Sequence, residues 1–99
     1  MKMVSLGTVN AVETSTPYSA GLNPFYPSAE ATVMVACDAF NGTVKVQTSS
    51  DGTSYTDVAT ITETGTDRTH MVALTDCKEY VRLNCTVRTA GEAEGFLLG

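Results

Sequence analysis

The stretch "VKVQTSSDGTSYTDVATIT", residues 44–62, decides the fold class of this chain. Its first four residues alternate between apolar and polar, which is typical of a strand with one buried face. The dipeptide Asp51-Gly52 follows, and both residue types tolerate the positive φ of a tight turn. The chain then alternates again, so the stretch predicts a β-hairpin. The apolar anchors expected in its second strand are Tyr55, Val58 and Ile61.

Similar patterns run through the rest of the chain. The clearest is at residues 79–89, where one face is expected to hold Val81, Leu83, Cys85 and Val87. Residues 31–37 form an apolar run typical of a buried strand, and a break in alternation at Gly7 indicates a bulge. Turns or polar links are expected at residues 38–42, 64–68, 76–78 and 90–95. Six or seven short strands, with turns about every ten residues, predict an all-β fold: a small antiparallel β-sandwich or a partly open barrel.

The length of 99 residues favours a single β domain spanning residues 1–99. Residues 1–30 are expected to include an extended N-terminal arm, or a first strand, and then a long loop. That loop, at residues 15–30, carries all three prolines of the chain, and each proline blocks regular helix and removes a ladder donor. Sixteen threonines also favour strands, because β-branched side chains suit a pleated surface.

Charge and apolar patterning narrow the classes of partner. The formal net charge is −5 and the six Lys and Arg residues are scattered, so we expect no nucleic acid partner. No apolar run reaches the length of a signal h-region or a membrane span, so we expect no membrane partner and synthesis in a cytoplasm. Three cysteines without a signal indicate free thiols, although an inter-sheet Cys37–Cys85 disulfide stays possible.

No constellation of catalytic or metal-binding residues stands out. His70 is the only histidine, and its neighbours supply neither a catalytic triad nor a zinc-site spacing. Ser49, Asp51 and Asp57 could offer oxygen atoms to calcium, but they lack the regular acidic spacing of a calcium loop, so a plain Asp-Gly turn is favoured. We therefore expect no enzyme, no catalytic residue, no metal and no cofactor.

A binding surface remains as the functional hypothesis. Large apolar side chains gather in the N-terminal arm, the proline loop and the C-terminal end, and rigid aromatic side chains are favoured at interfaces. These side chains either contact a partner or fold back to cap one end of the sandwich. The candidate interface residues are Val9, Val12, Tyr18, Leu22, Phe25, Tyr26, Phe96 and Leu97.

The hairpin resembles one found in many small phage structural proteins, with the pattern V-x-V-Q-x-S-x-D-G-x-x-[YW]-x-D-V. Here the pattern is carried by Val44, Val46, Gln47, Ser49, Asp51, Gly52, Tyr55, Asp57 and Val58. The short chain, the threonine-rich strands and the ending "GEAEGFLLG" are also similar to phage head decoration (capsid cement) proteins. This resemblance implies a virion protein on the outer capsid surface, which binds the major capsid protein and stabilises neighbouring subunits. It further implies a homo-oligomer, either a trimer or a dimer.

The same hairpin is also similar to part of discoidin-type and carbohydrate-binding modules, in which S-x-D-G-x-x-[YW] is frequent. That second resemblance implies a glycan-binding β-sandwich module on a particle surface. The aromatic residues that would form its platform are Tyr26, Tyr55 and Tyr80. A tail or connector component of a virus particle is the third hypothesis.

Overall fold

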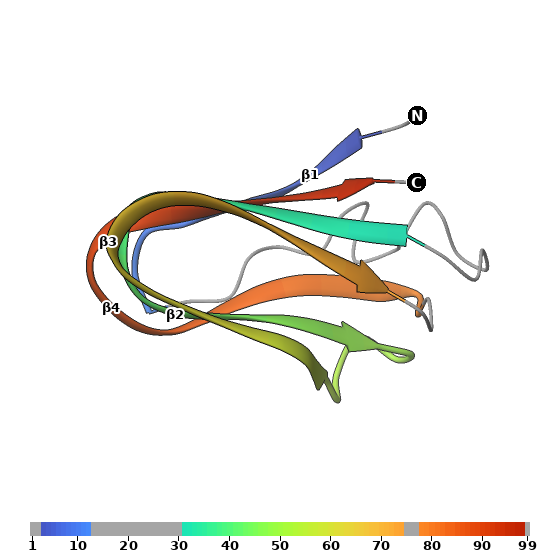
Figure 1. Cartoon of the computed structure of the whole chain (residues 1–99). Helices are drawn as coiled ribbons and strands as arrows, with labels where there is room; N and C mark the ends of the chain where they lie inside the picture. Colours follow the sequence, from blue (N-terminus) through green and yellow to red (C-terminus); the bar gives the residue numbers. More distant parts are fainter. Residues whose placement is uncertain (1–2, 13–30, 75–77, 99) are drawn as a thin grey trace.

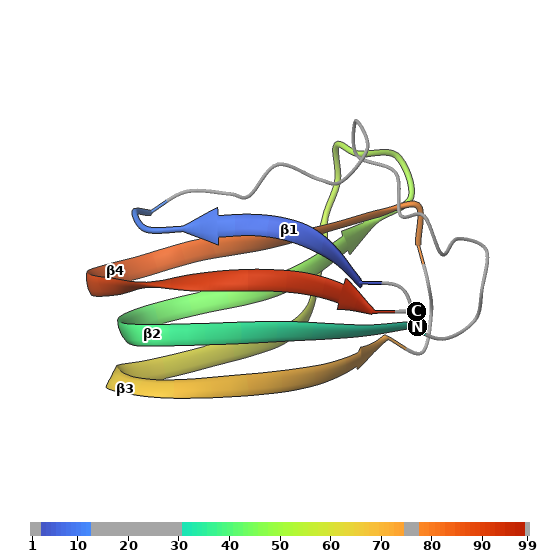
Figure 2. The ribbon, with the colours of Figure 1, turned by 90° about the horizontal axis from the view of Figure 1, so that it is seen from above.

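The residues that the structure describes form one antiparallel sheet of four strands. The structure is a computed structural model, and it describes residues 3–12, 31–74 and 78–98. The strands are β1 (Met3–Val9), β2 (Ala31–Ser49), β3 (Thr56–Leu74) and β4 (Tyr80–Leu98). Their order in the sheet is β1-β4-β2-β3, as Figure 2 shows. The predicted all-β antiparallel class is confirmed. The described part of the chain includes no helix long and apolar enough to cross a membrane.

The three long strands bend over, so that one sheet makes two layers (Figure 1). Each has 19 residues and would measure about 63 Å if straight, at roughly 3.3 Å per residue. The molecule measures only 35 Å along its longest axis, which requires the fold-over. The four-stranded layer contains β1, the first part of β2 and the last parts of β3 and β4. The three-stranded layer contains the last part of β2 and the first parts of β3 and β4.

The bends lie where the sequence predicted turns, at residues 38–42, 64–68 and 90–95. The chain does not reverse within the sheet at these segments, because each strand continues through them. Ala39 in β2, Gly65 in β3 and Gly91 in β4 adopt positive φ, of 49°, 95° and 74°. The pairing register shifts there as well, which marks bulges that turn a strand out of its plane. The prediction of six or seven short strands was therefore wrong for the described residues: the predicted turns at residues 38–42 and 64–68 lie inside β2 and β3, and the predicted polar link at residues 90–95 lies inside β4.

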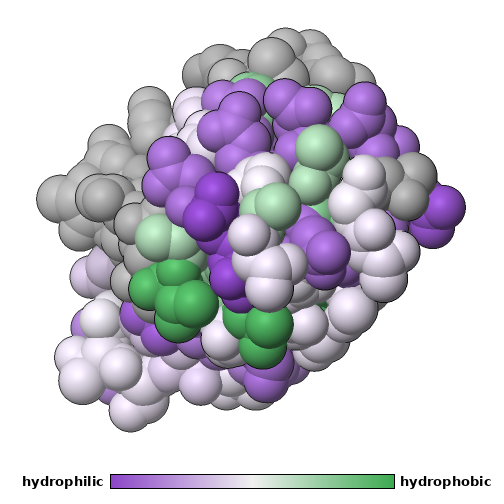
Figure 3. Space-filling model, turned by 90° about the vertical axis from the view of Figure 1, so that its left-hand side faces the viewer, coloured by the Kyte–Doolittle hydropathy of each residue, from purple (hydrophilic) through white to green (hydrophobic). Residues whose placement is uncertain are grey.

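Side chains satisfy the backbone groups that the bends release. The Asp67 carboxylate accepts a hydrogen bond from the Ala39 amide at 2.7 Å. Arg88 Nε donates to the Gly91 carbonyl at 2.8 Å. Figure 3 views the molecule from the side of the bends, where polar and weakly polar residues predominate and the apolar atoms form small separate groups. This end of the molecule is thus closed by its own polar contacts.

The hydrophobic core lies between the two layers. Val44, Val46, Val81, Leu83 and Cys85 are fully buried there, which confirms the predicted alternation of both strands. The other buried apolar residues are Leu6, Val9, Ala31, Val33, Val35, Cys37, Phe40, Ile61, Leu74, Ala93 and Leu97.

Val87 was predicted to share the buried face of β4, and this was wrong. Its side chain is 53% exposed. Val44 pairs with Cys85 while Thr43 pairs with Val87, so Thr86 is an extra residue that reverses the alternation. Val58, predicted as an anchor, is likewise an extra residue in β3 and is 41% exposed.

Residues 3–9 are not a free arm, because β1 pairs with the end of β4. The predicted irregularity at Gly7 is confirmed: the register shifts there and the residue has a φ of 94°. The predicted proline loop lies outside the described residues, and so do the candidates Tyr18, Leu22, Phe25 and Tyr26.

Candidate functional site

A continuous polar surface covers the outer side of the three-stranded layer. We call it the polar face. It consists of the outward side chains Thr43, Lys45, Gln47, Tyr55, Asp57, Thr60, Thr62, Tyr80, Arg82 and Asn84. In the paired parts of β2 and β4 the neighbouring side chains point into the core, because side chains alternate between the two sides of a strand, whereas Val58, next to Asp57, is exposed. All of these residues carry a hydroxyl, amide, carboxylate or cationic group, and the exposed Val87, opposite Thr43, is an apolar residue on the same side.

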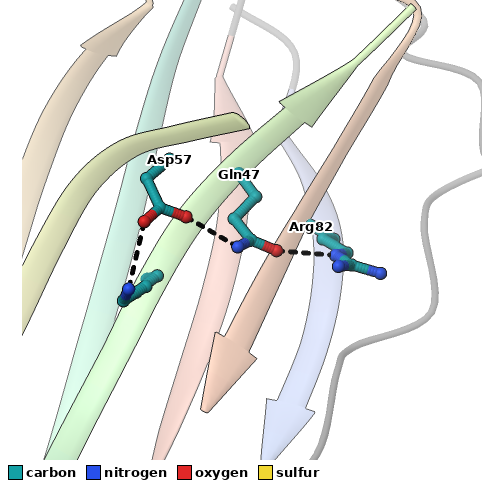
Figure 4. A network of polar contacts seen from close by, with 4 residues as sticks. Gln47, Asp57 and Arg82 are labelled. Carbon is teal, nitrogen blue, oxygen red and sulfur yellow. Dashed lines mark hydrogen bonds and ion pairs between the residues drawn. The ribbon is translucent and has the colours of Figure 1, made fainter. Parts of the chain in front are cut away.

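A row of hydrogen bonds crosses this face from β3 to β4 (Figure 4). Gln47 pairs with Asp57 on one side and with Arg82 on the other, so the three side chains stand opposite one another. Gln47 Nε2 donates to Asp57 Oδ1 at 2.7 Å, and Arg82 Nε donates to Gln47 Oε1 at 2.9 Å. Lys45 Nζ contacts the other carboxylate oxygen of Asp57 at 3.0 Å.

The bulge at Val58 places Asp57 in this row. Ala59 pairs with the inward-facing Val46, and plain alternation would therefore also turn Asp57 inward. The extra residue reverses the phase, so Asp57 lies on the outer side beside Gln47. Bulges often re-aim a side chain in this way next to a functional site.

The row is rigid and largely shielded from water at its centre. Gln47 is only 7% exposed, although it lies on an outer surface. The hydrogen bond from Gln47 and then that from Lys45 hold the pKa of Asp57 below its usual value. Asp57 is therefore a carboxylate at neutral pH, and it serves as an acceptor rather than as a general acid.

Two tyrosines lie at one end of the polar face. The guanidinium of Arg82 lies over the Tyr55 ring, 3.7 Å from its centroid. Burial raises the pKa of Tyr55, against the opposing charge of Arg82. The ring of Tyr80 lies next to Gly52 of the hairpin, where an added Cβ would meet it at 3.1 Å. Both tyrosines are half-buried, so each presents part of its ring.

A cavity of about 450 Å³ lies beside the hairpin, and it is lined by residues other than those of the polar face. Its wall carries the hydroxyl groups of the hairpin and the strand ends beside it. The lining residues are Thr48, Ser49, Ser50, Ser54, Thr56, Val58, Leu74 and Lys78. The hairpin is the predicted one, and Asp51 stabilises it: its Oδ1 accepts hydrogen bonds from the amides of Thr53 and Ser54.

His70, Cys37 and Cys85 are not part of the polar face, and Cys77 lies outside the described residues. His70 Nε2 hydrogen-bonds Glu63, whose side chain is almost fully buried. Cys37 and Cys85 are free thiols, so the possible disulfide between them does not form. Burial, and then the charge of Glu63, raise the pKa of Cys37, which makes its thiolate scarce. Within residues 3–12, 31–74 and 78–98, no three His, Cys, Asp or Glu side chains are grouped to hold a metal ion.

The predicted interface residues that the structure describes, Val9, Val12, Phe96 and Leu97, do not form one surface. Val9 and Leu97 are fully buried in the domain's own core, so they are not available to a partner. Val12 is 65% exposed, and Phe96 is half-buried on the outer side of the four-stranded layer. There Met34 pairs with both Phe96 and Met71. We call Met34, Met71 and Phe96 the apolar row.

Sequence reasoning noted several members of the polar face separately but did not assemble them. Lys45 and Gln47 were placed on an outward strand face, and Tyr55 and Tyr80 were named as a possible platform. For Asp57 the sequence indicates only a place in the hairpin pattern and a possible oxygen ligand for calcium. The missing information was the cross-strand register, which brings Gln47 beside Arg82 although they are 35 residues apart.

No family model matches the chain, and no curated protein matches it in sequence. Among solved structures it is similar to a mutant of a family 29 carbohydrate-binding module, made to probe the mechanism of ligand recognition. The TM-score is 0.52, and the match covers 100% of this chain and 92% of the other at 11% sequence identity. At that identity the similarity concerns the fold alone.

Proposed function

We propose that this chain is a non-catalytic carbohydrate-binding module and that the polar face is its ligand surface. The observation that carries the proposal is the row Asp57–Gln47–Arg82, set in an exposed sheet face beside Tyr55. The fold shared with a carbohydrate-binding module supports the same function.

The side-chain chemistry of the face suits a sugar. A pyranose offers neighbouring hydroxyl groups, which pair with planar groups that hold two donors or acceptors side by side. Carboxylate, amide and guanidinium are the side chains with that geometry. A sugar ring also has apolar C–H faces, and half-exposed tyrosine rings present a flat apolar surface with a polar tip. Tyr55 and Tyr80 supply such surfaces at one end of the row.

The hydrogen-bond row also lowers the cost of binding. Long polar side chains lose rotamer freedom when they hold a ligand, which weakens affinity. In this face Gln47 is already fixed by Asp57 on one side and Arg82 on the other. The unbound protein therefore presents these groups in a defined geometry, and less entropy remains to be lost.

The first experiment is a glycan array with the wild-type chain, followed by calorimetric titration of the strongest ligands. Tyr55→Ala is expected to weaken binding about tenfold, since a lost ring contact of about 1.4 kcal/mol is a factor of ten. Gln47→Ala is expected to weaken binding as well, because Asp57 and Arg82 lose the side chain that orients them. Thr69→Ala is the matched control, because Thr69 is exposed on the other layer. Thermal unfolding of each variant separates lost binding from lost folding. An array without a ligand, or site variants that bind like the wild type, would refute the proposal.

A second proposal keeps the capsid decoration role that the hairpin resembles. The apolar row favours it, because Met71 is 60% exposed beside Met34 and Phe96 and gives a second protein apolar area to cover. The occupant would be the major capsid protein of the virus. Wild-type chain is expected to co-sediment saturably with undecorated capsids, and Met71→Lys to weaken that binding. Absence of wild-type binding at micromolar concentration would end this proposal.

A further inference from the structure

Arg82 is the unusual cation of the polar face. Its Nε donates to Gln47 and its plane lies over Tyr55. Among the described residues it forms no ion pair with a carboxylate, and no hydrogen bond occupies its two outer nitrogens. Lys45 differs, since it is paired with Asp57, and Arg88 donates to the Gly91 carbonyl at the bend. Figure 4 shows the guanidinium extending beyond Gln47 at the end of the row.

From this geometry we infer that the polar face binds an anionic sugar, whose carboxylate or sulfate group pairs with the outer edge of Arg82. The inference rests on the proposed carbohydrate-binding function. A guanidinium presents two parallel N–H donors to a carboxylate or sulfate oxygen pair, which a neutral hydroxyl cannot match in charge. Gln47 and Tyr55 fix the plane of the guanidinium, so its outer edge is held ready for such a pairing.

The local charge favours the same ligand class. The chain as a whole carries a formal net charge of −5. The polar face nevertheless holds two cations, Lys45 and Arg82, and one carboxylate, Asp57. The nearby carboxylate Asp51 is held within the hairpin by backbone amides. With Asp51 counted, the two cations and two carboxylates here balance, so an anionic ligand meets less negative charge than the chain as a whole carries, and its orientation is set by the position of Arg82.

The test uses matched pairs of probes with the full chain. One pair is an oligogalacturonate and the same oligosaccharide with its carboxylates reduced to alcohols; the other is a sulfated galactan fragment and its desulfated form. We expect at least tenfold tighter binding of one anionic member at low salt, and a preference that shrinks as salt rises. A preference confined to one pair assigns the anion as a carboxylate or as a sulfate.

Two variants at Arg82 locate the effect. Arg82→Gln is expected to abolish the preference, and Arg82→Lys to restore only part of it because the planar fork is lost. Arg68→Gln removes the same charge from the opposite edge of the sheet, and it should leave the preference unchanged. Equal or tighter binding of the neutral members would overturn the inference while leaving the module's glycan binding intact. Binding of no member of either pair, together with an empty glycan array, would overturn the proposed function as well.

Discussion

At the residue scale, Asp51 shows how one carboxylate stabilises the hairpin. Its Oδ1 accepts hydrogen bonds from the amides of Thr53 and Ser54 and from the Ser49 hydroxyl. These bonds favour the ionised form, and they hold the pKa of Asp51 below its usual value in the folded chain. A group whose pKa is lowered by folding stabilises the fold above its unfolded pKa, and that contribution disappears as the pH falls through the folded pKa.

We therefore expect the urea midpoint of the wild type to be steady at neutral pH and to fall below about pH 4, where aspartate begins to protonate. Asp51→Asn should lower the midpoint at pH 7 and flatten this acid dependence, since an amide keeps an acceptor but no charge. The flattening should be partial, because the pKa of Asp57 is lowered too. Urea unfolding across a pH series is the measurement. Parallel curves for variant and wild type would show that the charge of Asp51 contributes nothing.

The sequence predicts the direction of most single side chains but not their partners. Alternation placed Val44, Val46 and Leu83 in the core and Gln47 outside it, and the structure agrees. It misplaced Val87, because one extra residue in a bulge reverses the phase and no local signal marks that residue. The low exposure of Gln47 was equally invisible, since it depends on residues of two other strands.

At the element scale, the backbones of β2 and β4 approach each other closely at their bends. Gly91 has a φ of 74°, and an added Cβ would lie 2.2 Å from the Ala39 carbonyl oxygen. Gly65, at the bend of β3, has a φ of 95° but nothing within 4 Å of an added Cβ. The two glycines share the conformational requirement, and only Gly91 has the close approach as well. They form a matched pair for separating the two effects.

Gly65→Ala is expected to lower the unfolding free energy by about 1–2 kcal/mol, because a residue with a Cβ is strained at a positive φ. Gly91→Ala should cost more, above about 3 kcal/mol, because the strain and a backbone clash add up and the neighbouring strand must shift. Urea denaturation of both variants measures the difference. Similar losses would mean that the bends of β2 and β4 can separate easily.

The same segments explain why the sequence predicted the wrong number of strands. Glycine and aspartate in "DAFNG" and "TGTDR" indicate positive φ and freed backbone groups. Those properties serve a hairpin, which reverses a chain within a sheet, and equally a bulge, which turns a strand out of its plane. A bulge forms here because β2, β3 and β4 all bend at the same level. The cross-strand register that aligns the three bends is a property of the assembled sheet.

At the scale of the whole molecule, the fold-over gives the two outer surfaces different chemistry. The polar face covers the three-stranded layer, and the apolar row lies on the four-stranded layer. The polar and the apolar residues can both be seen in the sequence. Each long strand, however, contributes one half to the three-stranded layer and the other half to the four-stranded layer. The polar face is therefore assembled from segments that are far apart in the chain, and only the strand order β1-β4-β2-β3 brings them together.

The same strand order makes β1 part of the folded sheet, so it is not an arm that is free to contact a partner. Leu6 and Val9 are buried in the core, and β1 pairs with the end of β4 along residues 93–98. Burying a leucine or valine side chain contributes about 1.5–3 kcal/mol, so the two residues supply about 3–6 kcal/mol. That is a large share of the roughly 5–15 kcal/mol that stabilises a domain.

Deletion of residues 1–9 is therefore expected to leave the chain largely unfolded, as measured by circular dichroism and urea unfolding. Thr8→Ala, which alters an exposed side chain of the same strand, should leave the midpoint nearly unchanged. A synthetic peptide of residues 1–12 should restore folding in part, because it can pair with β4 as an added strand. Loss of capsid or glycan binding in a chain without β1 would then report unfolding and not a lost contact. A truncated chain with the wild-type midpoint would instead show that β1 is dispensable for folding, and it would leave the N-terminal segment available to contact a partner.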